Sequence, residues 1–305
     1  MLEIYFKSLK DTNFQKIKDY KIGSWINVSN ATKEDLNKLV ELTGIEITDI
    51  QDSLDKMEIP RIEQKNDNTL LFVRHPYEEE DLSTLTMTII LTKSYLITIS
   101  PGKSKLTDSI LSSKTPLATT QKSKLLLFLL LKITQDFTNK IKTVKYLVTD
   151  QTKKIRGISN KTIVLLTKLE EKLNQYLSSL VPMGIMLEAI TSGRYISLYE
   201  KDQDLLQDLV IALKQSEDLC RINVKSIKSL RDAYQIIFTN DVNKTIKLLT
   251  AITIIFTIPT IIASIYGMNI KLPLATHLNA FSIIMAFTAI SCIALTYIFI
   301  KKNWI

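Results

Sequence analysis

The chain has 305 residues, 46% of them hydrophobic, and a formal net charge of +8 at pH 7. This length suits one large domain or two ordinary ones, and the charge suggests a polyanionic neighbour, nucleic acid or lipid. Two isolated cysteines exclude a disulfide framework and a cysteine metal site. The scattered glycines exclude a dinucleotide fingerprint and a P-loop, and two histidines cannot make a zincin motif. Glu3, Lys7 and Lys10 interrupt the N-terminus, so no signal peptide is expected.

Residues 1–115 predict a cytosolic α/β domain. Asn30 or Thr32 can cap its first helix, and Gly44 ends that helix. His75 precedes Pro76 at the end of a predicted strand, and we expect it to be a surface residue rather than a ligand. The predicted elements, in order, are a strand over Ser24–Val28, helices over Lys33–Leu42 and Asp49–Met57, and strands over Thr69–Arg74, Leu85–Leu91 and Tyr95–Ser100.

The pattern then changes to that of long helices. Two are predicted over Gln121–Ile155 and Thr162–Ile190, with a break at Gly157–Asn160. A third begins near Glu200 and meets neither Gly nor Pro until Pro259. We interpret it as one helix that runs on to residue 266, with a length on the order of 100 Å.

Two segments lack any charge: 19 residues from Leu248 to Tyr266 and 23 residues from Leu278 to Ile300. Each is long enough to cross a bilayer core of ~30 Å as a helix, although a pair of buried core helices is the alternative. Two lysines precede the first segment and two follow the second, whereas the link between them holds only Lys271 and a histidine. Lysine and arginine mark the cytoplasmic side of a membrane. We therefore expect a cell-membrane protein with both termini in the cytoplasm and the link on the outer side.

The first span carries its small hydroxyl residues at spacings of 3, 4, 3 and 4. This 3.5-residue period is typical of the seam of a left-handed helix bundle. Hydroxyl groups around a central axis would suit a pore wall, but they also pack membrane helices together. A pore would need several copies of the chain, because two spans cannot enclose one. The residues assigned to the pore wall are Asn243, Ile246, Leu249, Thr250, Thr253, Thr257, Thr260 and Ser264.

The motif Tyr266-Gly267-Met268-Asn269 ends this stripe and resembles the signature of the CorA family of magnesium and cobalt channels. The resemblance also includes Asn243, near the inner end of the helix, and Thr260, which matches a pore-facing threonine. It extends over essentially the whole chain, through Trp25–Asn30, Ile59–Ile62 and the basic tail Lys301–Ile305.

The resemblance implies a homopentamer with a cytosolic funnel that takes up Mg²⁺ or Co²⁺, with no enzymatic activity. Gly267 and Asn269 would form the outer mouth, and Met268 would fix the loop. Mg²⁺ sheds water reluctantly, so a ring of neutral oxygens can hold the hydrated ion without stripping it. In the family, Mg²⁺ between cytosolic domains closes the channel. Asp208 falls at the stalk carboxylate, although the helix dipole alone explains an aspartate there.

On this interpretation the chain has six consecutive parts. They are the α/β domain 1–115, a helical hairpin 116–199, a stalk helix 200–266 that includes the first span 248–266, an external link 267–277, the second span 278–300 and a cytosolic tail 301–305.

Three features depart from the family pattern. No acidic residue follows the motif in Ile270–Pro273, so this segment offers no carboxylate to attract cations at the outer side. Pro259 is adjacent to Thr260 rather than two residues before it, and it frees the carbonyl of Ile255. The hairpin holds nine basic and three acidic residues between positions 140 and 172, so its tip could contact anionic lipids.

Two other functions are alternatives. A zinc exporter of the same superfamily is the nearer one, although Met268 favours the magnesium type. A membrane-anchored signalling or nucleic-acid-binding module is the other. The basic residues are spread along helices without an RNA-binding motif, so no nucleic-acid partner is expected.

Overall fold

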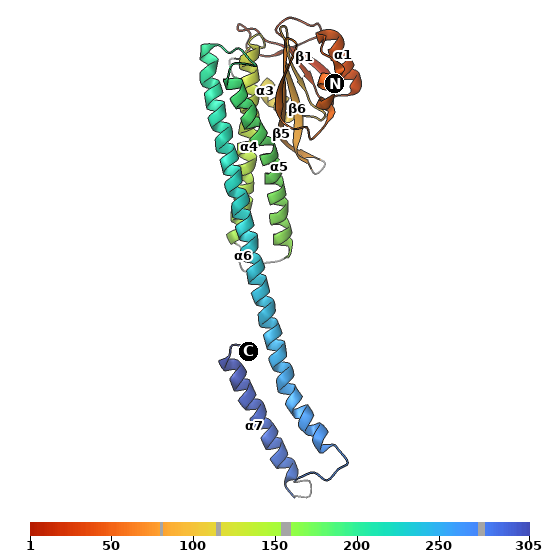
Figure 1. Ribbon diagram of the computed structural model, residues 1–305, viewed down its shortest axis with the longest axis vertical. Coiled ribbons are helices and arrows are strands. Elements are labelled where there is room, and N and C mark those ends of the chain that lie inside the picture. Colours follow the sequence, from red (N-terminus) through yellow and green to blue (C-terminus); the bar gives the residue numbers. More distant parts are fainter. Residues whose placement is uncertain (80–81, 114–116, 154–159, 274–277) are drawn as a thin grey trace. The chain divides into compact units, whose positions relative to one another are not determined.

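The computed structural model describes residues 1–79, 82–113, 117–153, 160–273 and 278–305. They form two compact units, Met1–Ser229 and Leu230–Ile305. The first unit is an α/β structure with long helices, and the second contains the end of a very long helix and one further apolar helix (Figure 1). The predicted fold class is confirmed in this respect.

The first unit is built on a seven-stranded sheet with the order β2-β1-β3-β7-β6-β5-β4. Strands β3 and β7 are parallel, and every other neighbouring pair is antiparallel. The strands are β1 (Leu2–Phe6), β2 (Gln15–Ile17), β3 (Trp25–Val28), β4 (Arg61–Lys65), β5 (Asn68–Glu79), β6 (Leu82–Leu91) and β7 (Leu96–Ile99). Sequence patterns found β3, β5, β6 and β7 but not β1, β2 or β4.

Helices cover both faces of this sheet. Leu70 and Phe72 point to the face on which helix α1 (Lys33–Thr43) packs, and they share a core with Leu36 and Leu39 of that helix. Leu71 lies between them and is equally buried from the opposite face. There the long helices α4 (Lys122–Lys153) and α5 (Asn160–Thr191) contact β5 and β6. Two buried faces explain why β5 reads as a continuous apolar run and not as an alternating one.

Helix α1 begins and ends where local chemistry predicts. Thr32 is the N-cap, and its side chain and that of Asp35 form a capping box. Of the two residues proposed as the cap, therefore, Thr32 is the correct one. Gly44 ends the helix in the left-handed region, with φ of 68°.

The helix predicted over Asp49–Met57 is wrong. A short helix α2 (Ile47–Ile50) passes into a 3₁₀ turn, η1 (Gln51–Leu54), and stops. The Asp55 side chain accepts a hydrogen bond from the backbone N–H of Met57, and the Lys56 carbonyl accepts one from Thr86 of β6. These two bonds use the Met57 N–H and the Lys56 carbonyl, which a continuing helix would need for its own hydrogen bonds. The segment after η1 therefore pairs with the sheet instead of extending the helix.

The surface position predicted for His75 is also wrong. β5 continues past Pro76 to Glu79, with an irregular register in that stretch, so the proline is tolerated within the strand. Only 3% of His75 is exposed, and its Nδ1 lies 3.0 Å from the Pro76 carbonyl oxygen. Burial lowers the pKa of His75 to about 4, which keeps the imidazole neutral at physiological pH.

The remaining helices follow the predicted pattern. The ends of α4 and α5 lie within a few residues of those expected, and the predicted break lies largely outside the described residues. A short helix that the sequence pattern missed, α3 (Lys105–Leu111), precedes them. Helix α6 (Glu200–Tyr266) has 67 residues, and α7 (Ala280–Lys301) has 22.

Both α6 and α7 are long and apolar enough to cross a membrane, with mean hydropathies of 2.2 and 2.4 over their most apolar windows. Only 6% of each window is buried. The core helix of a soluble protein would be mostly buried, so the alternative of two core helices is disfavoured.

Candidate functional site

One face of α6 in the second unit is covered by α7. The seam includes Ala251, which is buried, and Ile255, Ile258, Pro259 and Ile262, which are half-buried. The Sγ of Cys292 on α7 lies 3.7 Å from the carbonyl oxygen of Ile255 in this seam. The seam has the same 3.5-residue period as the hydroxyl stripe, and this period could have revealed it in the sequence.

The hydroxyl stripe lies on the opposite face of the same helix. From Thr253 onward, each stripe residue follows a seam residue by two positions, which corresponds to about 200° around an α-helix. Thr253, Thr257, Thr260 and Ser264 are all exposed, as is Thr250 one turn earlier. Within one chain, therefore, the stripe does not hold α6 against α7.

The stripe threonines have a common side-chain geometry. The hydroxyls of Thr250, Thr253, Thr257 and Thr260 each donate to the carbonyl four residues earlier, at 2.7 to 3.0 Å. The hydroxyl proton is therefore used within the helix, and the oxygen lone pairs remain available on the exposed face. Such oxygens can accept hydrogen bonds from the water around a hydrated cation.

The part of α6 before the stripe is apolar and also exposed. Ile246 and Leu249 are 55% and 66% exposed, and Asn243 is exposed one turn earlier. Further apolar side chains in this segment, Ile236, Phe238 and Val242, are 41–63% exposed. Contiguous exposed apolar surface of this kind calls for other copies of the chain or for lipid.

The Gly-Met-Asn motif begins at the end of α6. The N–H of Gly267 donates to the Ala263 carbonyl at 2.9 Å, which closes the last turn. A Cβ at position 267 would lie 3.2 Å from this oxygen, closer than ordinary side-chain contacts. The Tyr266 hydroxyl donates to the Pro273 carbonyl at 3.4 Å, which draws the link back toward the helix end. Met268 and Asn269 are exposed beside this turn.

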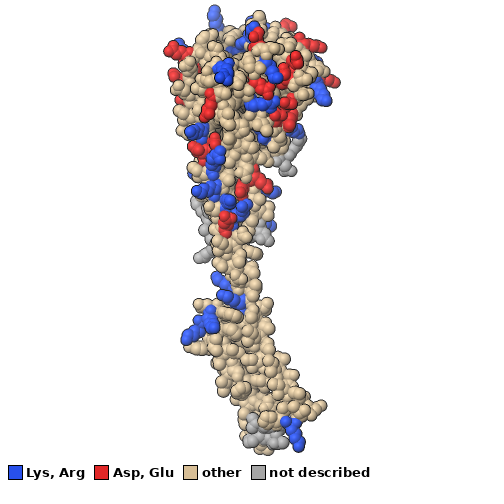
Figure 2. All heavy atoms as spheres, viewed as in Figure 1, with Lys and Arg blue, Asp and Glu red and all other residues tan. Residues whose placement is uncertain are grey.

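Charge is nearly absent from the second unit between its two ends. Figure 2 shows a tan surface there with blue lysine or arginine atoms near each end. Lys244, Lys247, Lys301 and Lys302 flank the apolar helices, and Lys271 is the charged residue of the link. This distribution is that of a membrane-spanning unit.

Asp208 is exposed on the part of α6 that belongs to the first unit. The described residues contain no group of three His, Cys, Asp or Glu side chains that could hold a metal ion. A metal at Asp208 would need ligands from outside this set, such as those of another copy.

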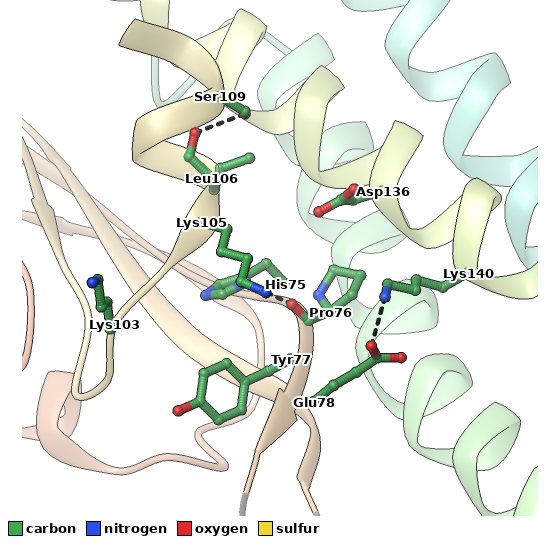
Figure 3. Close-up of a pocket in the computed structure, with 10 residues that line it drawn as sticks. All are labelled: His75, Pro76, Tyr77, Glu78, Lys103, Lys105, Leu106, Ser109, Asp136 and Lys140. Carbon is green, nitrogen blue, oxygen red and sulfur yellow. Dashed lines mark hydrogen bonds and ion pairs between the residues drawn. The ribbon is translucent and has the colours of Figure 1, made fainter. Parts of the chain in front are cut away.

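A separate hollow of about 270 Å³ lies in the first unit beside β5, α3 and α4 (Figure 3). Its charged lining residues are Glu78, Lys103, Lys105, Asp136 and Lys140. Lysines outnumber carboxylates, and Lys140 points at Glu78 with Nζ 2.7 Å from the carboxylate. This balance disfavours a divalent cation in the hollow.

Comparison with known proteins identifies the family of the chain. The sequence model of the family described as "CorA-like Mg2+ transporter protein" matches residues 21–302. The chain belongs to this CorA-like family. It is accordingly a divalent-cation transporter and a membrane protein with two candidate spanning helices.

Known CorA proteins are similar over almost the full length of the chain. The "Cobalt/magnesium transport protein CorA" of Methanocaldococcus jannaschii is 28% identical over 94% of this chain and 92% of its own length. The complete structure of the CorA magnesium transporter from the same organism matches with a TM-score of 0.84 and 26% identity, covering 100% of this chain and 99% of that one.

The cytoplasmic domain of ZntB from Vibrio parahaemolyticus matches 78% of this chain and 98% of its own length. The TM-score is 0.64 with 10% identity, so this similarity concerns the fold alone.

Proposed function

We propose that this protein is a homopentameric channel in the cell membrane that takes up Mg²⁺, and also Co²⁺, down the electrochemical gradient. The observation that carries the proposal is the hydroxyl stripe of α6, which α7 leaves uncovered and which ends at Gly267-Met268-Asn269. Five copies arranged around an axis would bring five such stripes together as the wall of one pore.

The outer mouth acts as the selectivity ring in this proposal. The side-chain amide of Asn269 and the Gly267 carbonyl offer neutral oxygens to a hydrated ion. Mg²⁺ keeps its inner water shell in such a ring, whereas carboxylates would hold the ion too tightly for release. Met268 contributes packing that fixes the turn.

The gate lies at the apolar end of the stripe. Ile246 and Leu249 would form a narrow ring, with Thr253 following it, that closes by dewetting when the helices approach one another. Asn243 lies at the cytosolic entrance to this ring. The exposed apolar surface of α6 before the stripe, around Phe238, supplies the contacts between neighbouring copies.

The orientation follows from the flanking lysines. Both termini face the cytoplasm, and the link with the motif faces outward. Entry of Mg²⁺ is then driven by roughly 4.6 kcal/mol per 100 mV, twice the value for a single elementary charge. Such a gradient requires a cytosolic brake, and we assign Asp208 to it as a ligand of regulatory Mg²⁺ between two copies.

The decisive experiment measures Mg²⁺ uptake by liposomes that contain purified protein. Asn269→Ala should abolish uptake while the oligomer and its thermal stability stay unchanged. Asn139→Ala, at an exposed position on α4, is the matched control and should transport normally. Normal uptake by Asn269→Ala would exclude the selectivity ring proposed here.

Gly267→Ala tests the same turn by a different route. The added Cβ would lie 3.2 Å from the Ala263 carbonyl, so the turn that carries Asn269 has to adjust by a few tenths of an ångström. Loss of uptake in this variant, with Asn269 intact, would show that the position of the amide matters as well as its presence.

A further inference from the structure

Pro259 leaves one backbone carbonyl of α6 without its helical partner. Proline has no N–H, so the carbonyl of Ile255, four residues earlier, receives no hydrogen bond from position 259. This carbonyl belongs to the apolar unit, where no water replaces the lost donor and an unpaired carbonyl is costly.

Cys292 of α7 meets this carbonyl. Its Sγ lies 3.7 Å from the Ile255 oxygen, and because a carbonyl only accepts, the thiol is the donor. Nearby hydroxyls of α7 act differently: those of Thr288, Ser291 and Thr296 each donate at 2.8 Å to a carbonyl of their own helix. The thiol thus makes a cross-helix bond at the position where the neighbouring helix lacks one.

We propose that Cys292 is a positioning residue of the pore, whose thiol replaces the hydrogen bond that Pro259 removes. The inference rests on the proposed function, because it gives the bond a role in transport. Thr257 and Thr260 lie on the same turns as Ile255 and Pro259 but on the uncovered face. Holding this part of α6 against α7 therefore sets the direction in which these two hydroxyls point.

The chemistry of a thiol suits this position. Sulfur is weakly polar, so a thiol costs little in an apolar helix pair, yet the S–H remains a donor. The bond is weak enough to break and re-form when α6 moves during gating.

The first test detects the bond without any transport. The chain has two cysteines, so Cys220→Ser leaves Cys292 as the sole thiol. The infrared S–H stretching band of this protein in liposomes should lie at the lower wavenumber of a hydrogen-bonded thiol. Pro259→Ala supplies a competing backbone N–H and should shift the band upward. A free-thiol band, or one that Pro259→Ala leaves in place, would overturn the proposal.

The second test is a double-mutant cycle on Mg²⁺ uptake. Cys292→Ala should lower uptake about two- to fivefold, the lower part of the range expected for one hydrogen bond. Cys292→Ser should recover little of the loss, because a serine hydroxyl on α7 donates to its own helix as that of Ser291 does, and the neighbouring Ser291→Ala is the control without effect. In the Pro259→Ala background, Cys292→Ala should change uptake less than about twofold, because the carbonyl then has its own partner.

An equal loss in both backgrounds would mean that Cys292 acts by packing and would overturn the proposed role. A parent protein that takes up no Mg²⁺ would refute the proposed function instead. The infrared measurement would still decide whether the hydrogen bond exists, so the two failures are distinguishable.

Discussion

Lys172 of α5 donates to the carboxylate of Glu78 at 2.7 Å, and this ion pair ties the hairpin helix to the longest strand of the sheet. Lys140 of α4 donates to the other carboxylate oxygen at the same distance. One acidic side chain therefore joins both long helices to β5. The two ammonium groups lower the pKa of Glu78 from 4.5 to about 2.

This pKa shift predicts how the first unit responds to acid. Because the folded-state pKa is the lower one, the stabilisation is fully present above about pH 4.5 and is lost as the pH falls toward about 2. Glu78 is 48% exposed, so solvent screening limits its contribution to about 1 kcal/mol or less. Glu78→Gln should lower the melting temperature at pH 7 by a few degrees at most, and the difference from the parent should vanish near pH 2. A difference that persists at pH 2 would contradict this account.

The stripe predicts that the Thr260 hydroxyl contributes to conduction. Thr260→Val keeps the shape and removes the oxygen, and it should lower single-channel conductance about two- to tenfold, the range for one hydrogen-bonding partner. Thr245→Val is the matched control, since Thr245 also donates to the carbonyl four residues earlier but lies off the stripe. Equal effects of the two changes would place the pore elsewhere.

The apolar ring predicts a leak when it is made polar. Ile246→Ser or Leu249→Ser should raise Mg²⁺ uptake at high internal Mg²⁺, where the parent channel is closed, because water then fills the constriction. Ile246→Val preserves the apolar surface and should close normally.

Cysteine-accessibility labelling tests the stripe independently: cysteines placed at positions 250 and 257 should react from the aqueous side. Labelling that found them facing lipid would refute the stripe as a pore wall.

The regulatory assignment predicts that Asp208→Asn raises the internal Mg²⁺ concentration needed for closure and reduces the protection that Mg²⁺ gives against proteolysis. The reason is that a hard cation loses a charged oxygen ligand. Asp218→Asn, also exposed on α6 but at a different angle around the helix, should close as the parent does. Unchanged closure in Asp208→Asn would leave Asp208 as a partner of the helix dipole only.

The features that the sequence predicted by itself depend on residues close together in the chain. The capping box of Thr32 and Asp35 lies within four residues, and the hydroxyl period from Thr250 to Ser264 repeats within a single helix. The uncharged lengths of the two spans likewise need no knowledge of distant residues. Such features follow from backbone geometry and side-chain chemistry within a few turns, so they are visible before folding.

Tertiary structure decided the features that depend on distant partners. The chain leaves its helix before Asp55 because Lys56 pairs with Thr86, and His75 is buried because β5 continues and helices cover it. The bond from Cys292 to Ile255, across 37 residues, comes from packing alone, as does the choice of α7 as the helix that lies against this face of α6. Burial and pairing between remote segments depend on the whole fold. A short stretch of sequence therefore does not identify the distant segment that it will contact.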